Sequence, residues 1–226
     1  MFFSVKNSLF HKRKNIPKIV HYVWVGDKNI NDTSFKDFFK GWKKNLKGYK
    51  FMFWNEKAIR NKWDNEYLNN AFDNKKWSNV SNLVRLLSLK EYGGIYMDTD
   101  IEVIDNFNEM MSKQCFLGFQ LKKHRTHWVN GAVIGSVPNH WFIDDCIKFL
   151  LEKYNGFESS DLSGPVVVTH VLKEMGLIKY STSGVLIKDV FIYPVEVFYP
   201  YSWREKFTKS CVKANTVAIH HWNKGW

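Results

Sequence analysis

The segment SNVSNLVRLLSLKEYGGIYM, residues 78–97, constrains the fold of this chain more than any other. Its apolar residues recur at the spacing of one face of an amphipathic helix, and they are Val80, Leu83, Val84 and Leu87. Gly93 and Gly94 end that helix, and the apolar run that includes residues 95–97 predicts a buried strand. A helix followed at once by a buried strand is typical of an α/β sheet.

Further segments alternate between strand and helix patterns in the same way. The predicted strands are residues 18–26, 49–54, 185–189, 190–193 and 217–220. The predicted helices are residues 35–46, residues 140–153 and a segment that starts at Gly164 and Pro165, since proline suits a first helical turn. This alternation predicts the α/β fold class.

No internal repeat, low-complexity tract or linker rich in proline and serine divides the 226 residues. A chain of this length can bury one sizeable core, and its apolar content of 45% is ordinary for a globular domain. We therefore expect one domain over residues 16–226 and a basic N-terminal arm over residues 1–15. The arm contains HKRKN at residues 11–15, which can contact an anionic membrane surface.

Charge and cysteine content bear on partners and compartment. Lys and Arg number 33 against 22 Asp and Glu, and the formal net charge of +11 favours nucleic acid, anionic lipid or phosphorylated small molecules. The three cysteines form no CxxC pair, so neither a disulfide framework nor a cysteine zinc site is indicated. No apolar run approaches the roughly 20 residues that span a bilayer. We expect a cytoplasmic protein that can make a peripheral contact with the inner face of the membrane.

Two aspartates, Asp98 and Asp100, follow the predicted strand directly. Side chains alternate along an extended segment, so the two carboxylates are expected to share one face. Carboxylates this close disfavour each other's ionisation unless a cation lies near them, and oxygen ligands suit Mg²⁺ or Mn²⁺. The carboxyl end of a strand in an open α/β sheet is also where ligands bind. The sequence therefore predicts a functional metal site here.

Five stretches of the chain resemble the DXD-containing sugar transferases. They are IPKIVHYVWVG (16–26), SNLVRLLSLKEYGGIYMDTDIEV (81–103), NGAVIGS (130–136), SGPVVVTHVL (163–172) and AIHHWNKGW (218–226). That family includes the initiating mannosyltransferase of yeast outer-chain glycosylation and bacterial capsule and lipopolysaccharide sugar transferases. More distantly, it includes the glucosylating domains of clostridial toxins. The helix with GGIYMDTD is the most specific block.

The resemblance implies a GT-A fold, a single Rossmann-like domain with a mixed, mostly parallel sheet flanked by helices. It also implies a retaining, metal-dependent transfer of a hexose from a nucleotide sugar, expected to be a UDP-sugar. The acceptor would be a glycan or lipid-linked saccharide in surface polysaccharide synthesis, and no nucleic acid partner is implied. Mn²⁺ or Mg²⁺ would stabilise the leaving diphosphate.

Several residues match the family's donor site by position. Trp24 matches the aromatic residue that stacks on the donor base, and Arg85 matches the arginine that contacts the donor. Asn82 stands where the family usually has Asp, so it keeps hydrogen-bonding ability but loses a charge. Asp100 would hold the metal, and Asp98 would face the ribose or donor sugar. Asp98, Asp100 and Arg85 are the candidate catalytic residues.

The C-terminal stretch supplies further candidates. The resemblance implies a late histidine as metal ligand, and we favour His220 over His221. Lys224 would contact the diphosphate, and Trp226 is a further candidate for donor binding. Gly225 stands where family members commonly have Ser, which removes a hydroxyl ligand. Of the ten tryptophans, Trp128 and Trp203 are candidates for the acceptor side.

Two rival functions remain open at this point. A strand followed by D-x-D also begins the haloacid-dehalogenase phosphatase motif, but that motif wants Thr or Val where this chain has Glu102. A basic nucleic-acid-binding domain would explain the charge, although no nucleic-acid motif accompanies it. Phosphate release from p-nitrophenyl phosphate and salt-dependent binding of DNA or RNA would reveal them.

Overall fold

The computed structural model describes residues 15–223. Its strands are β1 (Ile19–Val23), β2 (Lys50–Trp54), β3 (Gly94–Met97), β4 (Ile101–Val103), β5 (Cys115–Phe119), β6 (Val129–Ser136), β7 (Val185–Ile187), β8 (Val190–Tyr193) and β9 (Ala218–His220). Its α-helices are α1 (Phe35–Asn45), α2 (Glu56–Lys62), α3 (Glu66–Asp73), α4 (Trp77–Tyr92), α5 (Trp141–Lys153), α6 (Ser160–Ser163), α7 (Pro165–Glu174) and α8 (Val195–Phe198). Three 3₁₀ turns, η1 (Ile30–Asp32), η2 (Asn108–Met110) and η3 (Lys209–Cys211), complete the described elements.

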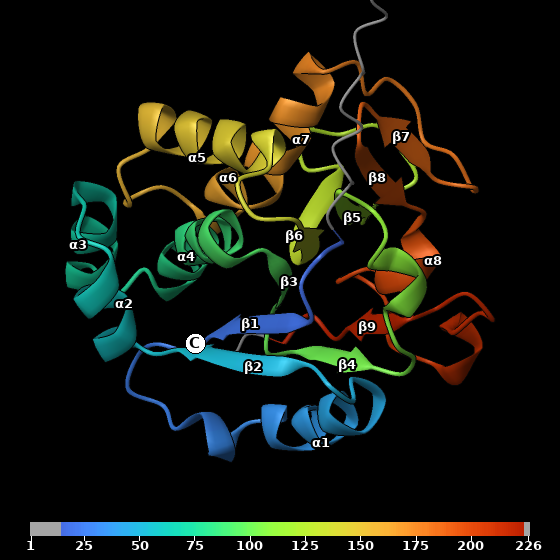
Figure 1. Cartoon of the computed structure of the whole chain (residues 1–226), viewed down its shortest axis with the longest axis horizontal. Coiled ribbons are helices and arrows are strands. Elements are labelled where there is room, and N and C mark those ends of the chain that lie inside the picture. The colour runs from blue at the N-terminus through green and yellow to red at the C-terminus, as the bar shows by residue number, and fades with distance from the viewer. Residues whose placement is uncertain (1–14, 224–226) are drawn as a thin grey trace, which may run out of the picture.

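Seven strands form one sheet in the order β2-β1-β3-β6-β5-β8-β7 (Figure 1). The pairs β2–β1, β1–β3 and β5–β8 are parallel, whereas β6 is antiparallel to both β3 and β5, and β7 is antiparallel to β8. Five strands therefore run in one direction and two run against them. The expected mixed, mostly parallel sheet is confirmed.

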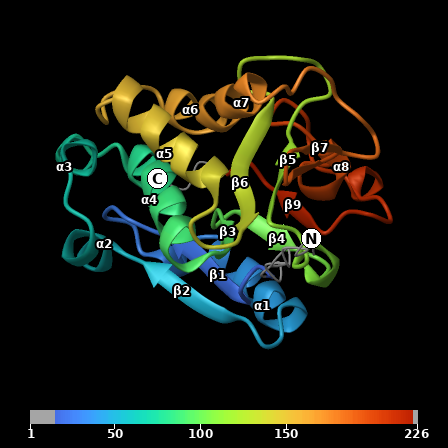
Figure 2. The same ribbon diagram turned by 45° about the horizontal axis from the view of Figure 1, so that its top comes forward.

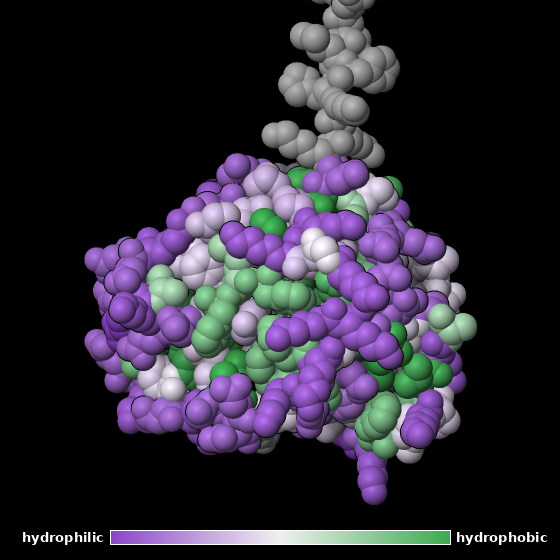
Figure 3. Space-filling model, turned by 60° about the horizontal axis from the view of Figure 1, so that its bottom comes forward, coloured by the Kyte–Doolittle hydropathy of each residue, from purple (hydrophilic) through white to green (hydrophobic). Residues whose placement is uncertain are grey.

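The sheet lies between two layers. Helices α4, α5 and α7 cover one face, and helix α1 with the two-stranded sheet β4–β9 lies against the other (Figures 1 and 2). Each face of the sheet has its own hydrophobic core, because side chains alternate between the faces along a strand. Ile95 and Met97 pack toward α1, and Tyr96 packs toward α4. The α1 side, brought forward in Figure 3, is largely hydrophilic around a smaller apolar area.

The junction between α4 and β3 depends on its two glycines. Gly93 caps α4 with φ +61°, and its N–H donates to Leu89 O. Gly94 has φ +102°, and a Cβ there would stand 2.6 Å from Ile19 O. Only glycine tolerates both the positive φ and this approach, so the chain can leave the helix and join β1 without a loop.

The predicted helices and strands are all present, with ends shifted by a few residues. The helix expected over residues 140–153 is α5, the helix expected from Pro165 is α7, and the three late strands are β7, β8 and β9. The expected basic arm at residues 1–15 lies outside the described residues, apart from Asn15. Among residues 15–223, no helix is long and apolar enough to cross a membrane.

Candidate active site

A cavity of about 600 Å³ opens where β1 and β3 end. It is lined by residues from the ends of β1 and β3, from α4, and from the segments around β5, β6 and β9. The candidates for the donor and metal site that line it are Trp24, Asn82, Arg85, Asp98, Asp100 and His220. The cavity therefore lies at the carboxyl ends of the strands, where a ligand was predicted to bind. The described candidates for the donor and metal site meet in this cavity.

The two aspartates lie in a turn, and the expected extended geometry was wrong. Ile101 N donates to Asp98 O at 3.1 Å, which closes a turn over residues 98–101. The turn is held from outside, because the Trp42 indole N–H donates to Ile101 O at 2.7 Å. Both carboxylates still point into the same cavity. Their convergence comes from the turn and not from strand alternation.

Asp98 is fixed by a cation and a phenol. Arg85 Nη2 donates to Asp98 Oδ1 at 3.0 Å, and the Tyr96 hydroxyl donates to the same oxygen at 2.8 Å. Ser81 Oγ lies 2.7 Å from the Tyr96 hydroxyl, and the Arg85 guanidinium sits 4.7 Å from the centre of the Tyr96 ring. Because Arg85 is buried with its charge paired, it neutralises a carboxylate inside the cavity.

Asp100 is contacted by residues of and after strand β9, near the C-terminal end of the chain. The first residue of β4, Ile101, pairs with His220 of β9, which places His220 Nε2 3.2 Å from Asp100 Oδ1. Asn223 N donates to Asp100 Oδ2 at 2.8 Å. The side chain of His221 points elsewhere, with Nε2 2.8 Å from Glu102 Oε2. The structure therefore brings His220 to the aspartates and keeps the His221 ring away.

The three groups differ in their protonation chemistry. Burial raises the pKa of Asp98, and the Asp100 carboxylate adds to this rise while Arg85 opposes it. Burial acts on Asp100 in the same direction, but the charge and hydrogen bond of His220 and the Asn223 N–H hold the pKa of Asp100 below its ordinary value. Although burial opposes protonation of His220, Asp100 raises the pKa of that imidazole.

Asp98, Asp100 and His220 together offer a metal-binding set. One ligand atom from each lies within 4.8 Å of the other two. Within the described residues, the Nδ1 atom of His220 is buried and has no hydrogen-bond partner. Two carboxylate oxygens and an imidazole nitrogen are donors that Mn²⁺ accepts, and Mg²⁺ favours the oxygens.

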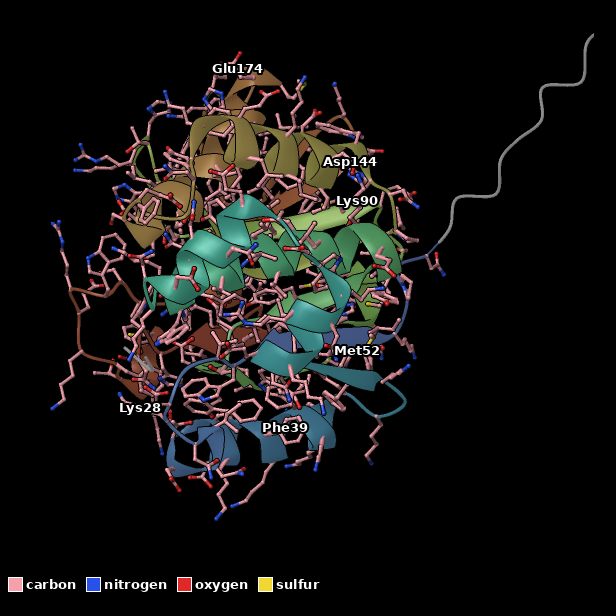
Figure 4. The ribbon with its side chains drawn as sticks, turned by 90° about the vertical axis from the view of Figure 1, so that its left-hand side faces the viewer. Lys28, Phe39, Met52, Lys90, Asp144 and Glu174 are labelled. Carbon is pink, nitrogen blue, oxygen red and sulfur yellow. The ribbon has the colours of Figure 1, made fainter. Side chains whose placement is uncertain are left out.

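Trp24 and Asn82 line the cavity away from the aspartates' ion pairs. The Trp24 indole N–H donates at 2.7 Å to the carbonyl of Lys28, a residue labelled in Figure 4. Asn82 Nδ2 donates to Ser160 O at 2.9 Å and to Ser163 Oγ at 3.0 Å. Trp24 is buried, so the indole edge is fixed in the wall. Asn82 ties α4 to the short helix α6.

The acceptor-side tryptophans have separate positions. Trp128 is fully buried, packs on Phe119 at 5.1 Å between ring centres and does not line the cavity. That expectation was wrong, because β6 begins beside it and turns the indole into the core. Trp203 does line the cavity and is 42% exposed. Lys224 and Trp226 lie outside the described residues, so their expected roles stay predictions.

Sequence reasoning missed several polar side chains of the site, among them Tyr96, Ser81, Gln120 and Asn130. Tyr96 and Ser81 position Asp98, and Tyr96 stands two residues before it, so strand alternation could have revealed this partner. Gln120 and Asn130 line the cavity together, with Asn130 Nδ2 donating to Gln120 Oε1 at 2.6 Å. No local signal marks this pair, because it depends on how β5 and β6 are paired.

Two family models match consecutive parts of the chain. Residues 32–117 match the glycosyltransferase sugar-binding region containing the DXD motif. Residues 136–226 match the alpha 1,4-glycosyltransferase conserved region. The first segment contains Asn82, Arg85 and both aspartates, and the second contains His220. The two matches therefore cover both sides of the candidate metal site.

Several curated proteins are similar to this chain. The human lactosylceramide 4-alpha-galactosyltransferase is 28% identical over 154 residues, which are 64% of this chain and 41% of that protein. The human alpha-1,4-N-acetylglucosaminyltransferase is 31% identical over 147 residues, covering 63% of this chain and 40% of that protein. An uncharacterized glycosyltransferase of Acanthamoeba polyphaga mimivirus is 30% identical over 145 residues, which are 62% of this chain and 57% of that protein. The chain thus spans about two fifths of the length of the human relatives.

Solved structures share the fold at low identity. The PaToxG glycosyltransferase superposes with a TM-score of 0.55 at 20% identity, covering 71% of this chain and 69% of that one. The galactosyltransferase LgtC superposes with a TM-score of 0.50 at 9% identity, and the match covers 91% of this chain and 87% of that one. The sheet, the DXD turn and the two family matches agree: this chain belongs to the DXD-containing glycosyltransferases and has the GT-A fold.

Proposed function

We propose that this protein is a retaining, metal-dependent glycosyltransferase that moves a hexose from a UDP-sugar to a glycan or lipid-linked saccharide. The observation that carries the proposal is the convergence of Asp98, Asp100 and His220 in one cavity with Arg85. These three potential metal ligands and a buried cation lie at the carboxyl ends of the strands. Such a group suits a ligand with a diphosphate.

The donor atoms of this group fit Mn²⁺ or Mg²⁺. The set holds two carboxylates, and the buried His220 adds a nitrogen that Mn²⁺ accepts. Asp100 and His220 would hold the ion, with Asp98 beside them. A bound divalent cation supplies Lewis-acid stabilisation of the charge that develops on a departing diphosphate.

The remaining side chains would bind and orient the donor. Arg85 holds Asp98 in place and offsets its negative charge beside the donor. Trp24 offers an apolar wall for a base, and its N–H is already engaged with Lys28 O. Asn82 would present its amide oxygen to a ribose or sugar hydroxyl from α4. Lys224 and Trp226 would act from the C-terminal end.

Retention and the UDP-hexose donor are supported by chemistry and by similarity. The second matched family is described as alpha 1,4-glycosyltransferase, and the human relatives carry names that specify an alpha-galactosyl or alpha-1,4-linked product. UDP-galactose and UDP-N-acetylglucosamine are α-glycosyl diphosphates, so transfer to an α-linked product keeps the configuration. The acceptor of the lactosylceramide enzyme is a glycolipid, in keeping with a saccharide acceptor here.

A donor-hydrolysis assay tests the proposal. UDP release from UDP-galactose, UDP-N-acetylglucosamine and UDP-glucose is measured with added Mn²⁺ and then with EDTA, which should abolish it. His220→Asn should raise the Mn²⁺ concentration for half-maximal release about 10–100-fold, if losing a ligand costs at least as much as losing a neighbour of one. His221→Asn is the matched control and should change it less. Metal-independent release, or an equal response of the two variants, would reject the metal assignment.

The same preparation addresses the rival functions. None of the reported similarities supports a phosphatase or a nucleic-acid-binding domain, and p-nitrophenyl phosphate should remain intact. We further propose that residues 16–226 form the catalytic domain. The cytoplasmic location, the membrane contact of the basic arm and a role in surface polysaccharide synthesis stay predictions.

A further inference from the structure

Two loops each contribute an aromatic ring to the wall of the cavity. The first, residues 121–128, joins β5 to β6, and the second, residues 202–209, follows α8. His127 of the first loop and Trp203 of the second both line the cavity, and their ring centres lie 5.9 Å apart. Trp203 also stands 5.5 Å from the ring of Trp222, which in turn lies 4.0 Å from His220. A continuous row of rings therefore leads from the metal-binding set to the surface.

Both loops carry positive charge. The first holds Lys122, Lys123 and Arg125 with no acidic residue, and the second holds Arg204, Lys206 and Lys209 against Glu205 alone. All six cations are exposed. Glu205 is occupied within its own loop, because it accepts the Ser202 N–H at 2.8 Å.

These cations have no acidic partner among the described residues, whereas several cations on the helices are held in ion pairs. On the helices, Lys40 pairs with Asp37, Arg60 with Glu56 and Lys90 with Asp144, at 2.8–2.9 Å. Over residues 15–223, none of the six loop cations forms an ion pair with an acidic side chain. None of the six lines the cavity either, so their charge stands outside the donor's space.

The position of this charge selects among ligands. A donor diphosphate held at Asp100 lies inside the cavity, whereas the loop cations stand on the segments that bring His127 and Trp203 to its wall. They would therefore act on the part of a second ligand that extends outward. The wall beside them has an exposed indole and the amides of Gln120 and Asn130, a combination that suits the apolar face and hydroxyls of a sugar.

We propose that the acceptor is a saccharide that bears a phosphate or carboxylate group, stacked on Trp203 and attracted by the two basic loops. This rests on the proposed glycosyl transfer and specifies its acceptor class. Opposite charge on these loops accelerates encounter and favours anionic over neutral acceptors, and salt screens both effects.

Binding is measured separately from turnover. Ligand-observed NMR in the presence of UDP compares methyl β-glucuronide and glucose 6-phosphate with methyl β-glucoside. The first two should bind more tightly, and added salt should weaken only them. In a second arm, a detergent-solubilised prenyl diphosphate sugar is compared with the soluble anionic sugars. If the prenyl diphosphate sugar binds more tightly, the acceptor is lipid-linked. If the two bind equally, the acceptor is a free anionic glycan.

Charge-removing variants locate the effect. Lys122→Gln/Lys123→Gln/Arg125→Gln should weaken binding of the anionic sugars by about tenfold, since each exposed cation contributes a factor of about two at low salt. Methyl β-glucoside should be unaffected. The matched control, Lys44→Gln/Lys47→Gln/Lys57→Gln, removes the same charge from exposed positions away from the cavity. Trp203→Ala should weaken charged and neutral sugars alike.

Four results would overturn the proposal: equal affinity for charged and neutral sugars, an equal loss in the control variant, no saccharide binding at all, or binding only to vesicles of anionic lipid. The last would assign the loops to a membrane surface. UDP release without acceptor is assayed in parallel. Failure there rejects the proposed function, whereas intact release with no preference for anions rejects the acceptor class alone.

Discussion

A buried histidine in β1 allows a quantitative test of the core. His21 is fully buried, and the Trp54 indole N–H donates to its Nδ1 at 3.2 Å. Its Nε2 lies 2.8 Å from Gly93 O and donates to that carbonyl. A neutral imidazole with one acceptor and one donor satisfies both contacts. A second proton on Nδ1 would point at the Trp54 N–H, so the folded state favours the neutral ring.

The size of the effect follows from the pKa. Burial lowers the pKa of His21 to about 4, with the Gly93 hydrogen bond opposing the shift and Lys50 adding to it. In the unfolded chain the imidazole has a pKa of about 6.5. Above that value both states are neutral and stability is unaffected. As pH falls from 6.5 to about 4, only the unfolded state takes the proton, so the free energy of unfolding drops by about 3 kcal/mol in total.

Urea unfolding at about pH 7.5 and about pH 4.5 measures this loss. The decline for the wild type should exceed that for His21→Gln by about 2–3 kcal/mol, because the variant has no imidazole to protonate. His21→Gln should itself be about 1–3 kcal/mol less stable at the higher pH, since a buried polar contact is disturbed. His124→Gln, an exposed control, should follow the wild type. Equal declines for His21→Gln and the wild type would refute the neutral, buried imidazole.

Three further changes test the fold and the site. Gly94→Ala should destabilise the protein by at least about 2 kcal/mol more than Gly176→Ala, because both glycines have φ +102° but only Gly94 faces a backbone atom, and chemical denaturation compares them. Arg85→Lys should lower UDP-sugar turnover at least about tenfold with the fold kept, since an ammonium cannot reproduce the guanidinium's planar contact with Asp98, and unchanged turnover would remove Arg85 from the site. Asn82→Asp should cost about 1–3 kcal/mol in thermal or urea unfolding, because a carboxylate cannot donate to Ser160 O, and a variant as stable as the wild type would contradict that hydrogen bond.

The local part of the site could be predicted from the sequence. Helix α4 and strand β3 have strong periodic patterns and a glycine pair between them, so their existence and order are fixed within one segment. Arg85 lies three residues after Asn82 on the helix, and both line the cavity as that spacing predicts. Short-range periodicity thus located most of the donor side.

The geometry of the aspartates depended on contacts far away in the chain. Trp42 of α1 holds the carbonyl of Ile101, and β9 pairs with β4 so that His220 reaches Asp100. No pattern near residue 100 encodes either contact. The sequence favoured His220 over His221 through resemblance and through alternation along the predicted strand 217–220, and the structure separates them by contacts: the ring of His221 is held by Glu102.

The structure explains why position 82 has Asn and not Asp, which the sequence alone could not explain. The Nδ2 group of Asn82 donates to the backbone carbonyl of Ser160 and to Ser163 Oγ, two contacts that fix α6 against α4. A carboxylate would accept from the serine hydroxyl but would meet the carbonyl of Ser160 with a lone pair. Gly164 leaves room for this arrangement, because a Cβ there would stand 3.1 Å from Asn82 Oδ1. The departure from the family's usual Asp is therefore matched by its surroundings: the amide builds the cavity wall, and its loss of charge leaves Asp98, Asp100 and Asp161 as the acidic residues that line the cavity.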